Sequence, residues 1–127
     1  MRRSEKEWAP EGGIRPRKGS HMELMSGNEA IAQGAWEAGA RIGTAYPGTP
    51  STETMEAFAK KDGVYAEWCV NEKVAVEVAV GASAAGARVL STMKHVGVNV
   101  AADPLFTAPD TGVGGGGVVL AADGPRK

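Results

Sequence analysis

Hydrophobic positions along the chain alternate between the 3.6-residue spacing of amphipathic helices and the short apolar runs of buried strands. Ser26 and Glu29 fit a capping box, and Gly39 is a typical helix stop. Predicted helices cover 26–38, 50–59, 72–86 and 98–106. The second has Thr49 as N-cap and Pro50 as its first residue, and Asn71 caps the third. Predicted strands cover 41–46, 64–70, 88–92 and 117–122.

This regular alternation of helix and strand predicts an α/β fold, a three-layer parallel sheet with helices on both faces. Functional residues in such sheets gather at the carboxyl ends of the strands. Three predicted loops fall at that edge, namely Tyr46–Thr49, Val70–Glu72 and Met93–Gly97. We therefore expect any chemistry to lie there.

Length and composition narrow the classes of protein. A chain of 127 residues is long enough for one domain, and its net charge of −1 indicates no nucleic-acid partner. Cys69 is the only cysteine, which excludes an internal disulfide and a multi-cysteine metal site within this chain. No apolar run approaches the roughly 20 residues of a membrane span, so a cytoplasmic protein is the simplest interpretation. Residues 1–22 are interpreted as a disordered tail or the scar of an expression tag, and 23–127 as the domain.

Glu72 is the most informative single residue. It stands between an apolar strand and a helix rich in alanine, where it could be an exposed acid that favours the helix dipole. Alternatively, rigid elements could shield it from water and ready it for proton exchange. Glu67 and Glu77 are nearby alternatives, one within a predicted strand and the other in mid-helix.

The other two loops also carry candidate chemistry. Residues 46–52 could bind an anion through free backbone N–H groups and hydroxyls, or could simply cap a helix. Lys94 and His95 could bind an anion or shuttle protons, or could belong to a solvated loop. Small residues recur at helical spacing and predict a closely packed helix face, at Ala75, Ala79, Ala82 and Gly86. The run 112–117 fits neither a P-loop nor a dinucleotide fingerprint, so a tight turn is expected there.

Three motifs in order, YPGTPST, NEKVA with its small-residue helix, and STMKHVG, resemble the start of the alpha subunit of indolepyruvate ferredoxin oxidoreductase. The resemblance runs from about Leu24 to Asp123. That enzyme belongs to the thiamine-diphosphate-dependent 2-oxoacid:ferredoxin oxidoreductases. The resemblance therefore implies the pyrimidine-binding domain of the thiamine-diphosphate fold. Such enzymes oxidatively decarboxylate 2-oxoacids, here aryl pyruvates, to acyl-coenzyme A and reduce ferredoxin.

The resemblance also implies roles for individual residues. Glu72 would hydrogen-bond the aminopyrimidine ring and activate the cofactor. Tyr46, Pro47 and Gly48 would complete the cofactor side of the site. The remaining motif positions would contact the substrate, namely Thr49, Lys94 and His95.

The chain departs from the family in what it lacks. No Gly-Asp-Gly-type motif for diphosphate and magnesium is present, nor are cysteine motifs for 4Fe-4S clusters. The resemblance therefore implies that thiamine diphosphate is completed by magnesium and clusters from other regions, with no metal site in this chain. The expected partners are a diphosphate-binding domain or the remaining alpha subunit, a beta subunit, ferredoxin and coenzyme A. We expect a C-terminally truncated fragment, inactive alone; the alternative is a non-catalytic α/β interaction module.

Overall fold

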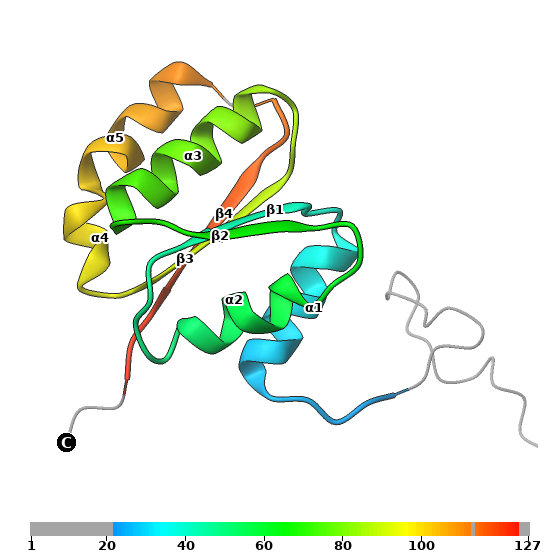
Figure 1. Cartoon of the computed structure of the whole chain (residues 1–127). Coiled ribbons are helices and arrows are strands. Elements are labelled where there is room, and N and C mark those ends of the chain that lie inside the picture. Colours follow the sequence, from blue (N-terminus) through cyan, green and yellow to red (C-terminus); the bar gives the residue numbers. More distant parts are fainter. Residues whose placement is uncertain (1–21, 113, 125–127) are drawn as a thin grey trace, which may run out of the picture.

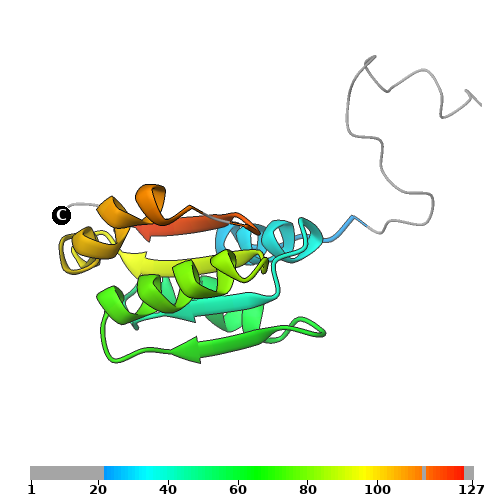
Figure 2. The same ribbon diagram turned by 90° about the horizontal axis from the view of Figure 1, so that it is seen from above.

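The computed structural model describes residues 22–112 and 114–124, which form one parallel sheet between two layers of helices (Figure 1). The strands lie in the order β2-β1-β3-β4, with bounds β1 Ile42–Ala45, β2 Tyr65–Trp68, β3 Val89–Lys94 and β4 Gly117–Ala122. The helices are α1 Gly27–Glu37, α2 Thr52–Ala59, α3 Glu72–Ala84, α4 Gly97–Val100 and α5 Ala102–Thr111. Helices α1 and α2 cover one face of the sheet, and α3, α4 and α5 cover the other (Figures 1 and 2). The predicted three-layer α/β fold is confirmed.

The register of the sheet brings all four carboxyl ends to one edge. Ala45 at the end of β1 pairs with Trp68 of β2 on one side and with Thr92 of β3 on the other. Lys94 at the end of β3 pairs with Ala122 at the end of β4. Every strand is therefore followed by a loop at the same edge, as parallel pairing requires.

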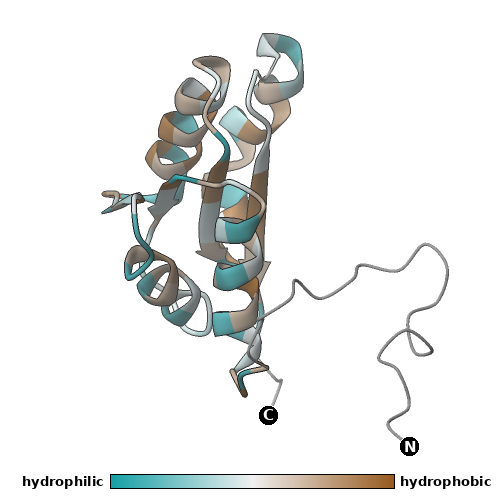
Figure 3. Ribbon diagram, turned by 90° about the vertical axis from the view of Figure 1, so that its right-hand side faces the viewer, coloured by the Kyte–Doolittle hydropathy of each residue, from teal (hydrophilic) through white to brown (hydrophobic). Residues whose placement is uncertain are grey.

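The face covered by α1 and α2 holds the larger core, and the strands between the helical layers are mostly brown in Figure 3. Gly43 of β1 lies directly under α2, where an added Cβ would stand 2.8 Å from Met55 Sδ and from the Phe58 ring. Only a glycine lets these two side chains lie flat on the strand, and both are almost fully buried. This close contact fixes α2 against the sheet.

The opposite face packs α3 onto β1 and β3. Thr44 Oγ1 donates a 2.7 Å hydrogen bond to the carbonyl oxygen of Ala75, so the helix backbone lies directly on the strand. Ala75 and Ala79 are buried and Ala82 is half-buried, so the predicted close packing of the small-residue face is confirmed in its first part. Gly86 lies beyond the last helical residue, is exposed and has a positive φ, so it ends the helix and does not belong to that face.

Several expected element boundaries are wrong, among them the strand predicted over 64–70, which is only Tyr65–Trp68. The second helix begins at Thr52 behind Ser51, so Thr49 is not its N-cap and Pro50 is not its first residue. The single helix predicted over 98–106 is two helices that meet at Ala101, a fully buried residue. The third strand continues to Lys94, which was expected in a loop.

Other expectations concern the two ends of the chain. The interpretation of residues 1–22 as a tail, His21 included, falls almost wholly outside the described residues. Among the residues that the structure does describe, no helix is both long and apolar enough to cross a bilayer.

Candidate functional site

The three loops that sequence analysis singled out are joined at the carboxyl edge of the sheet. Cys69 N–H, just after β2, donates a 2.7 Å hydrogen bond to Ala45 O at the end of β1. Gly48 lies against Lys94 at the end of β3, because a Cβ on Gly48 would stand 2.9 Å from Lys94 Cβ. These contacts hold the loops after β1, β2 and β3 in one place.

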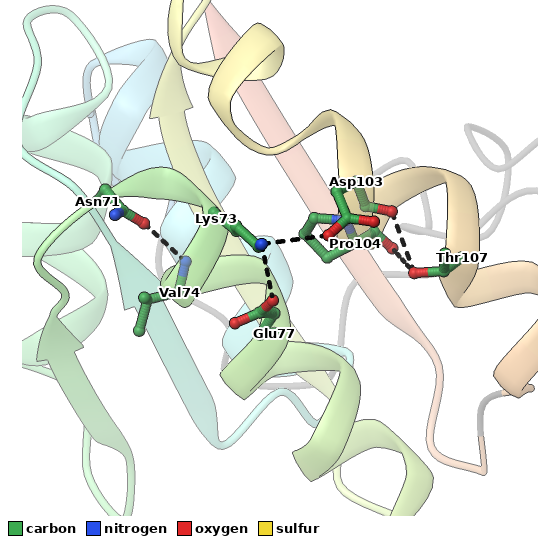
Figure 4. Close-up of polar contacts among 7 residues, drawn as sticks. All are labelled: Asn71, Lys73, Val74, Glu77, Asp103, Pro104 and Thr107. Atoms are coloured by element: carbon green, nitrogen blue, oxygen red, sulfur yellow. Dashed lines mark hydrogen bonds and ion pairs between the residues drawn. The ribbon is translucent and has the colours of Figure 1, made fainter.

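Glu72 lies at the centre of this arrangement, as the first residue of α3. Asn71 caps the helix, since its Oδ1 accepts a 2.9 Å hydrogen bond from Val74 N–H (Figure 4). Glu72 is only 8% exposed, and a Cβ on Gly97 would stand 2.5 Å from both its Cγ and its Oε1. Within the described residues, no group hydrogen-bonds to its carboxyl oxygens. The alternative of an exposed helix-start acid is therefore wrong.

A network between α3 and α5 fixes the helix that carries Glu72. Lys73 Nζ lies 3.2 Å from Asp103 Oδ2 of α5 and 3.8 Å from Glu77 Oε1, one turn along α3 (Figure 4). Glu77 is exposed on its own helix, which agrees with its interpretation as a surface charge. Thr107 Oγ1 donates to Asp103 O at 3.0 Å and so ties Asp103 into α5.

Glu67, the other alternative, lies in β2 with both carboxyl oxygens engaged. Tyr65 donates a 2.6 Å hydrogen bond to its Oε2, and Cys69 Sγ lies 3.4 Å from its Oε1. The hydrogen bond to Glu67 raises the pKa of the Tyr65 hydroxyl above its usual value. Burial, followed by the hydrogen bond to Glu67 and its charge, raises the pKa of the Cys69 thiol to about 11. The Glu67 carboxyl is therefore hydrogen-bonded by Tyr65 and Cys69 and is not free to bind a ligand.

The loop after β1 is ordered by its own hydrogen bonds. Gly48 N–H donates to Thr52 Oγ1 at 2.8 Å, and Ser51 Oγ donates to Gly48 O at 2.6 Å. One backbone donor of the expected anion site is therefore already used. The side chains that remain open to a ligand are those of Tyr46, Pro47 and Thr49, all exposed at this edge.

Lys94 and His95 lie at the end of β3, and the structure adds a residue that the sequence did not indicate. His95 Nδ1 lies 3.0 Å from Asp123 Oδ1, and Lys94, half-buried, has no ion-pair partner among the described residues. Asp123 follows the predicted last strand directly, so the rule of looking at carboxyl ends could have found it. The last strand carries no motif of its own, so no other sequence signal points to this acid.

The described residues suit an organic ligand at this edge. A mostly shielded acid with no hydrogen-bond partner of its own, a half-buried lysine and exposed tyrosine and threonine side chains offer one carboxyl, one cation and further hydrogen-bonding groups. No cluster of three or more metal-binding side chains occurs in the described part of the chain.

Comparison with known proteins identifies the relatives of this chain. No family model matches it. Indolepyruvate oxidoreductase subunit IorA of Archaeoglobus fulgidus is 52% identical over 119 residues, which are 88% of this chain and 19% of that subunit. The same subunit of Thermococcus kodakarensis is 53% identical over 105 residues, 80% of this chain and 16% of that subunit. The chain thus spans less than a fifth of the length of these relatives.

Other similarities are weaker and lie within related enzymes. Subunit KorA of 2-oxoglutarate synthase from Methanocaldococcus jannaschii is 37% identical over 82 residues, 62% of this chain and 22% of that subunit. The solved structure of 2-oxoglutarate:ferredoxin oxidoreductase from Magnetococcus marinus, with 2-oxoglutarate, coenzyme A and succinyl-CoA bound, matches with a TM-score of 0.58 and 29% identity. That match covers 60% of this chain and 14% of the solved chain.

Proposed function

We propose that this chain, a homologue of one segment of the IorA subunits and so a relative of the 2-oxoacid:ferredoxin oxidoreductases, provides the pyrimidine-binding half of a thiamine diphosphate site. Residues 23–127 would form that domain. The observation that carries the proposal is Glu72, a residue only 8% exposed that is held against Gly97 and whose carboxyl oxygens have no hydrogen-bond partner in the described part. Its carboxyl oxygens are not among the fully buried atoms, so a mostly shielded acid that the fold does not use remains open to a ligand at this edge.

Glu72 would act by exchanging a proton with a ring nitrogen of the aminopyrimidine, to which its carboxyl would be hydrogen-bonded. Thiamine diphosphate, when bound, supplies an electron sink for the bond that breaks beside the 2-oxo carbon. Gly97 lies against the Glu72 side chain and Asn71 caps the helix that carries it, and the segment of Tyr46, Pro47 and Gly48 would lie beside the ring.

The substrate would bind at the same edge through the remaining candidates. Lys94 offers a cation and Thr49 a hydroxyl for the carboxylate of a 2-oxoacid, with His95 beside them. By similarity to the IorA subunits, we infer an aryl pyruvate such as indolepyruvate. Such an acid and coenzyme A would give the arylacetyl-coenzyme A, carbon dioxide, a proton and two electrons for ferredoxin. Magnesium, 4Fe-4S clusters and a beta subunit would come from other parts of the assembly.

A chimera tests the proposal directly. Residues 24–123 would replace the matching segment of the Archaeoglobus fulgidus IorA subunit, and the assembled enzyme would be assayed with indolepyruvate, coenzyme A and a redox dye. We expect activity, because the segments are about half identical. Glu72→Gln, which keeps the shape and removes the acid, should lower kcat at least about a hundredfold. Glu77→Gln, on the exposed side of the same helix, is the matched control and should retain activity.

Two results would contradict the proposal. One is a folded, fully assembled chimera without activity, which would show that the segment does not provide this half-site. The other is a Glu72→Gln chimera with full activity, which would remove Glu72 from proton transfer. Preference for 2-oxoglutarate over indolepyruvate in the active chimera would contradict only the inferred substrate.

A specific observation also favours a second role, in assembly. Large apolar side chains are exposed at both edges of the sheet, where Tyr65, Trp68 and Val70 lie in and just after β2, and Val118 lies on β4. Exposed apolar side chains at the edge after β2 are typical of a surface that meets a partner. A non-catalytic interaction module would use this surface alone, and its chimera would assemble normally with Glu72→Gln while Trp68→Ser and Val70→Ser weakened assembly.

A further inference from the structure

The geometry points to Asp123 as a positioning residue that holds the His95 imidazole with its proton on Nδ1, so that only the bare Nε2 is offered to a ligand. The role of His95 toward a substrate rests on the proposed function. The state of the ring does not, because it follows from contacts within this chain. Sequence motifs do not reveal Asp123, since it lies 28 residues beyond His95 along the chain.

Two contacts hold His95 to the end of β4. Its backbone N–H donates to Ala122 O at 2.9 Å, and its Nδ1 lies 3.0 Å from Oδ1 of the next residue, Asp123. The backbone contact directly follows the last ladder pair, Lys94 with Ala122, so it continues the sheet by one residue. Backbone and ring are therefore fixed by two consecutive residues of the same segment.

The chemistry of the pair decides where the proton lies. An ionised carboxylate only accepts hydrogen bonds, so the nitrogen facing it must carry a hydrogen. Of the two neutral tautomers of an imidazole, Asp123 thus favours Nδ1–H and disfavours Nε2–H, which free histidine prefers in water. In its neutral state His95 can then accept at Nε2 but cannot donate there.

This state separates the tasks of the two neighbours at the end of β3. Lys94, with three donors and no acceptor, suits the carboxylate of a 2-oxoacid. His95 suits the opposite kind of group, a hydroxyl or ring N–H that presents a proton. Without Asp123, a neutral ring would prefer to donate at Nε2 and would duplicate the function of Lys94.

Nitrogen-15 NMR of the full chain measures the tautomer without any cofactor. The chain contains only His21 and His95, so a His21→Gln variant leaves one set of imidazole signals. Long-range proton–nitrogen spectra distinguish the Nδ1–H ring from the Nε2–H ring and from the doubly protonated ring. We expect Nδ1–H to dominate. Asp123→Ala should shift the ratio toward Nε2–H by about two- to fivefold, the range that an exposed charged hydrogen bond supports.

Asp103→Ala is the control, because Asp103 is a similarly exposed acid that pairs with Lys73 and not with His95. It should leave the tautomer ratio unchanged. A wild-type ring in the Nε2–H form, or a ratio that does not move in Asp123→Ala, would overturn the inference. The wild-type spectrum decides even where the variant fails to fold. An Nδ1–H ring together with an inactive chimera would retain this inference and reject the proposed function.

Discussion

Glu67 and Glu72 stand on consecutive elements, at β2 and at the head of α3, yet their surroundings are opposite. Glu67 is half-buried and both of its carboxyl oxygens have partners within β2 and the residue after it, Tyr65 and Cys69. Glu72 is 8% exposed, and among the described residues its carboxyl has no hydrogen-bond partner. The less accessible acid is thus the one without a partner.

This difference separates an acid that serves the fold from one that is kept for a ligand. Partners from its own strand satisfy Glu67, so the fold loses little by keeping it. Glu72 loses most of its exposed surface, and no hydrogen bond within the described residues compensates for the water lost, so we expect it to lower the stability of the folded state. Proteins retain residues that lower their stability mainly where function requires those residues.

The strongest test of this contrast concerns the space around Glu72. Gly97→Ala would place a methyl group 2.5 Å from Glu72 Cγ, so either the side chain or α4 must move. We expect a loss of about 1–3 kcal/mol in the free energy of unfolding, as for other overpacked sites, measured by urea denaturation. Gly81→Ala on the exposed side of α3 is the control, because nothing lies within 4 Å of its added Cβ. It should stabilise the chain slightly.

A double mutant shows whether Glu72 is the cause. In Glu72→Ala the Cγ and carboxyl are gone, so Gly97→Ala should then cost much less, whereas Glu72→Gln keeps the shape and should keep the full cost. Equal losses in all three backgrounds would mean that Gly97 is constrained by something other than Glu72.

The second test concerns the net cost of the buried acid. Glu72→Met replaces it with an apolar side chain of similar size and should raise the free energy of unfolding by roughly 1 kcal/mol. Glu67→Met removes an acid that has two partners and should not stabilise the chain. If thermal unfolding shows Glu72→Met to be less stable than wild type, Glu72 makes a stabilising contact within the fold, and the contrast with Glu67 fails.

Local signals in the sequence predicted those parts of the fold that local hydrogen bonds determine. Asn71 caps α3 through its own side chain, and the capping box of Ser26 and Glu29 is present with both of its bonds. The last strand, 117–122, has its predicted bounds. The predicted start of α2 was wrong, because the hydrogen bond from Gly48 N–H to Thr52 Oγ1 belongs to a loop that continues past Pro50.

The candidate site was predictable in its position but not in its contacts. Parallel pairing brought the three loops to one edge, as the strand rule requires. The burial of Glu72 depends on Gly97, 25 residues away, and the tie of His95 depends on Asp123. No local pattern in a single sequence indicates such pairs. The residue roles carried over by resemblance, at Tyr46 to Thr49, Glu72, Lys94 and His95, stay predictions.

The smallest expected effect is on the other side of the comparison, at Cys69 beside Glu67. Its pKa is raised to about 11, first by burial and then by the hydrogen bond and charge of Glu67. Glu67→Gln removes the charge but not the burial, so the pKa should fall only part of the way toward the usual value of about 8.5. The thiolate is the reactive form, so alkylation by iodoacetamide at pH about 8.5 should quicken by a few-fold.

Because the folded pKa of Cys69 lies above the unfolded one, the thiol's contribution to stability is complete below about pH 8.5 and is lost as the pH rises through about 11. Glu67→Gln should narrow the pH range over which this stability is lost, and solvent screening at this partly exposed site keeps the contribution to the free energy of unfolding small. Glu77→Gln should change neither the rate nor the pH dependence, and a rate unchanged in Glu67→Gln would show that Glu67 is not a partner of the thiol in solution.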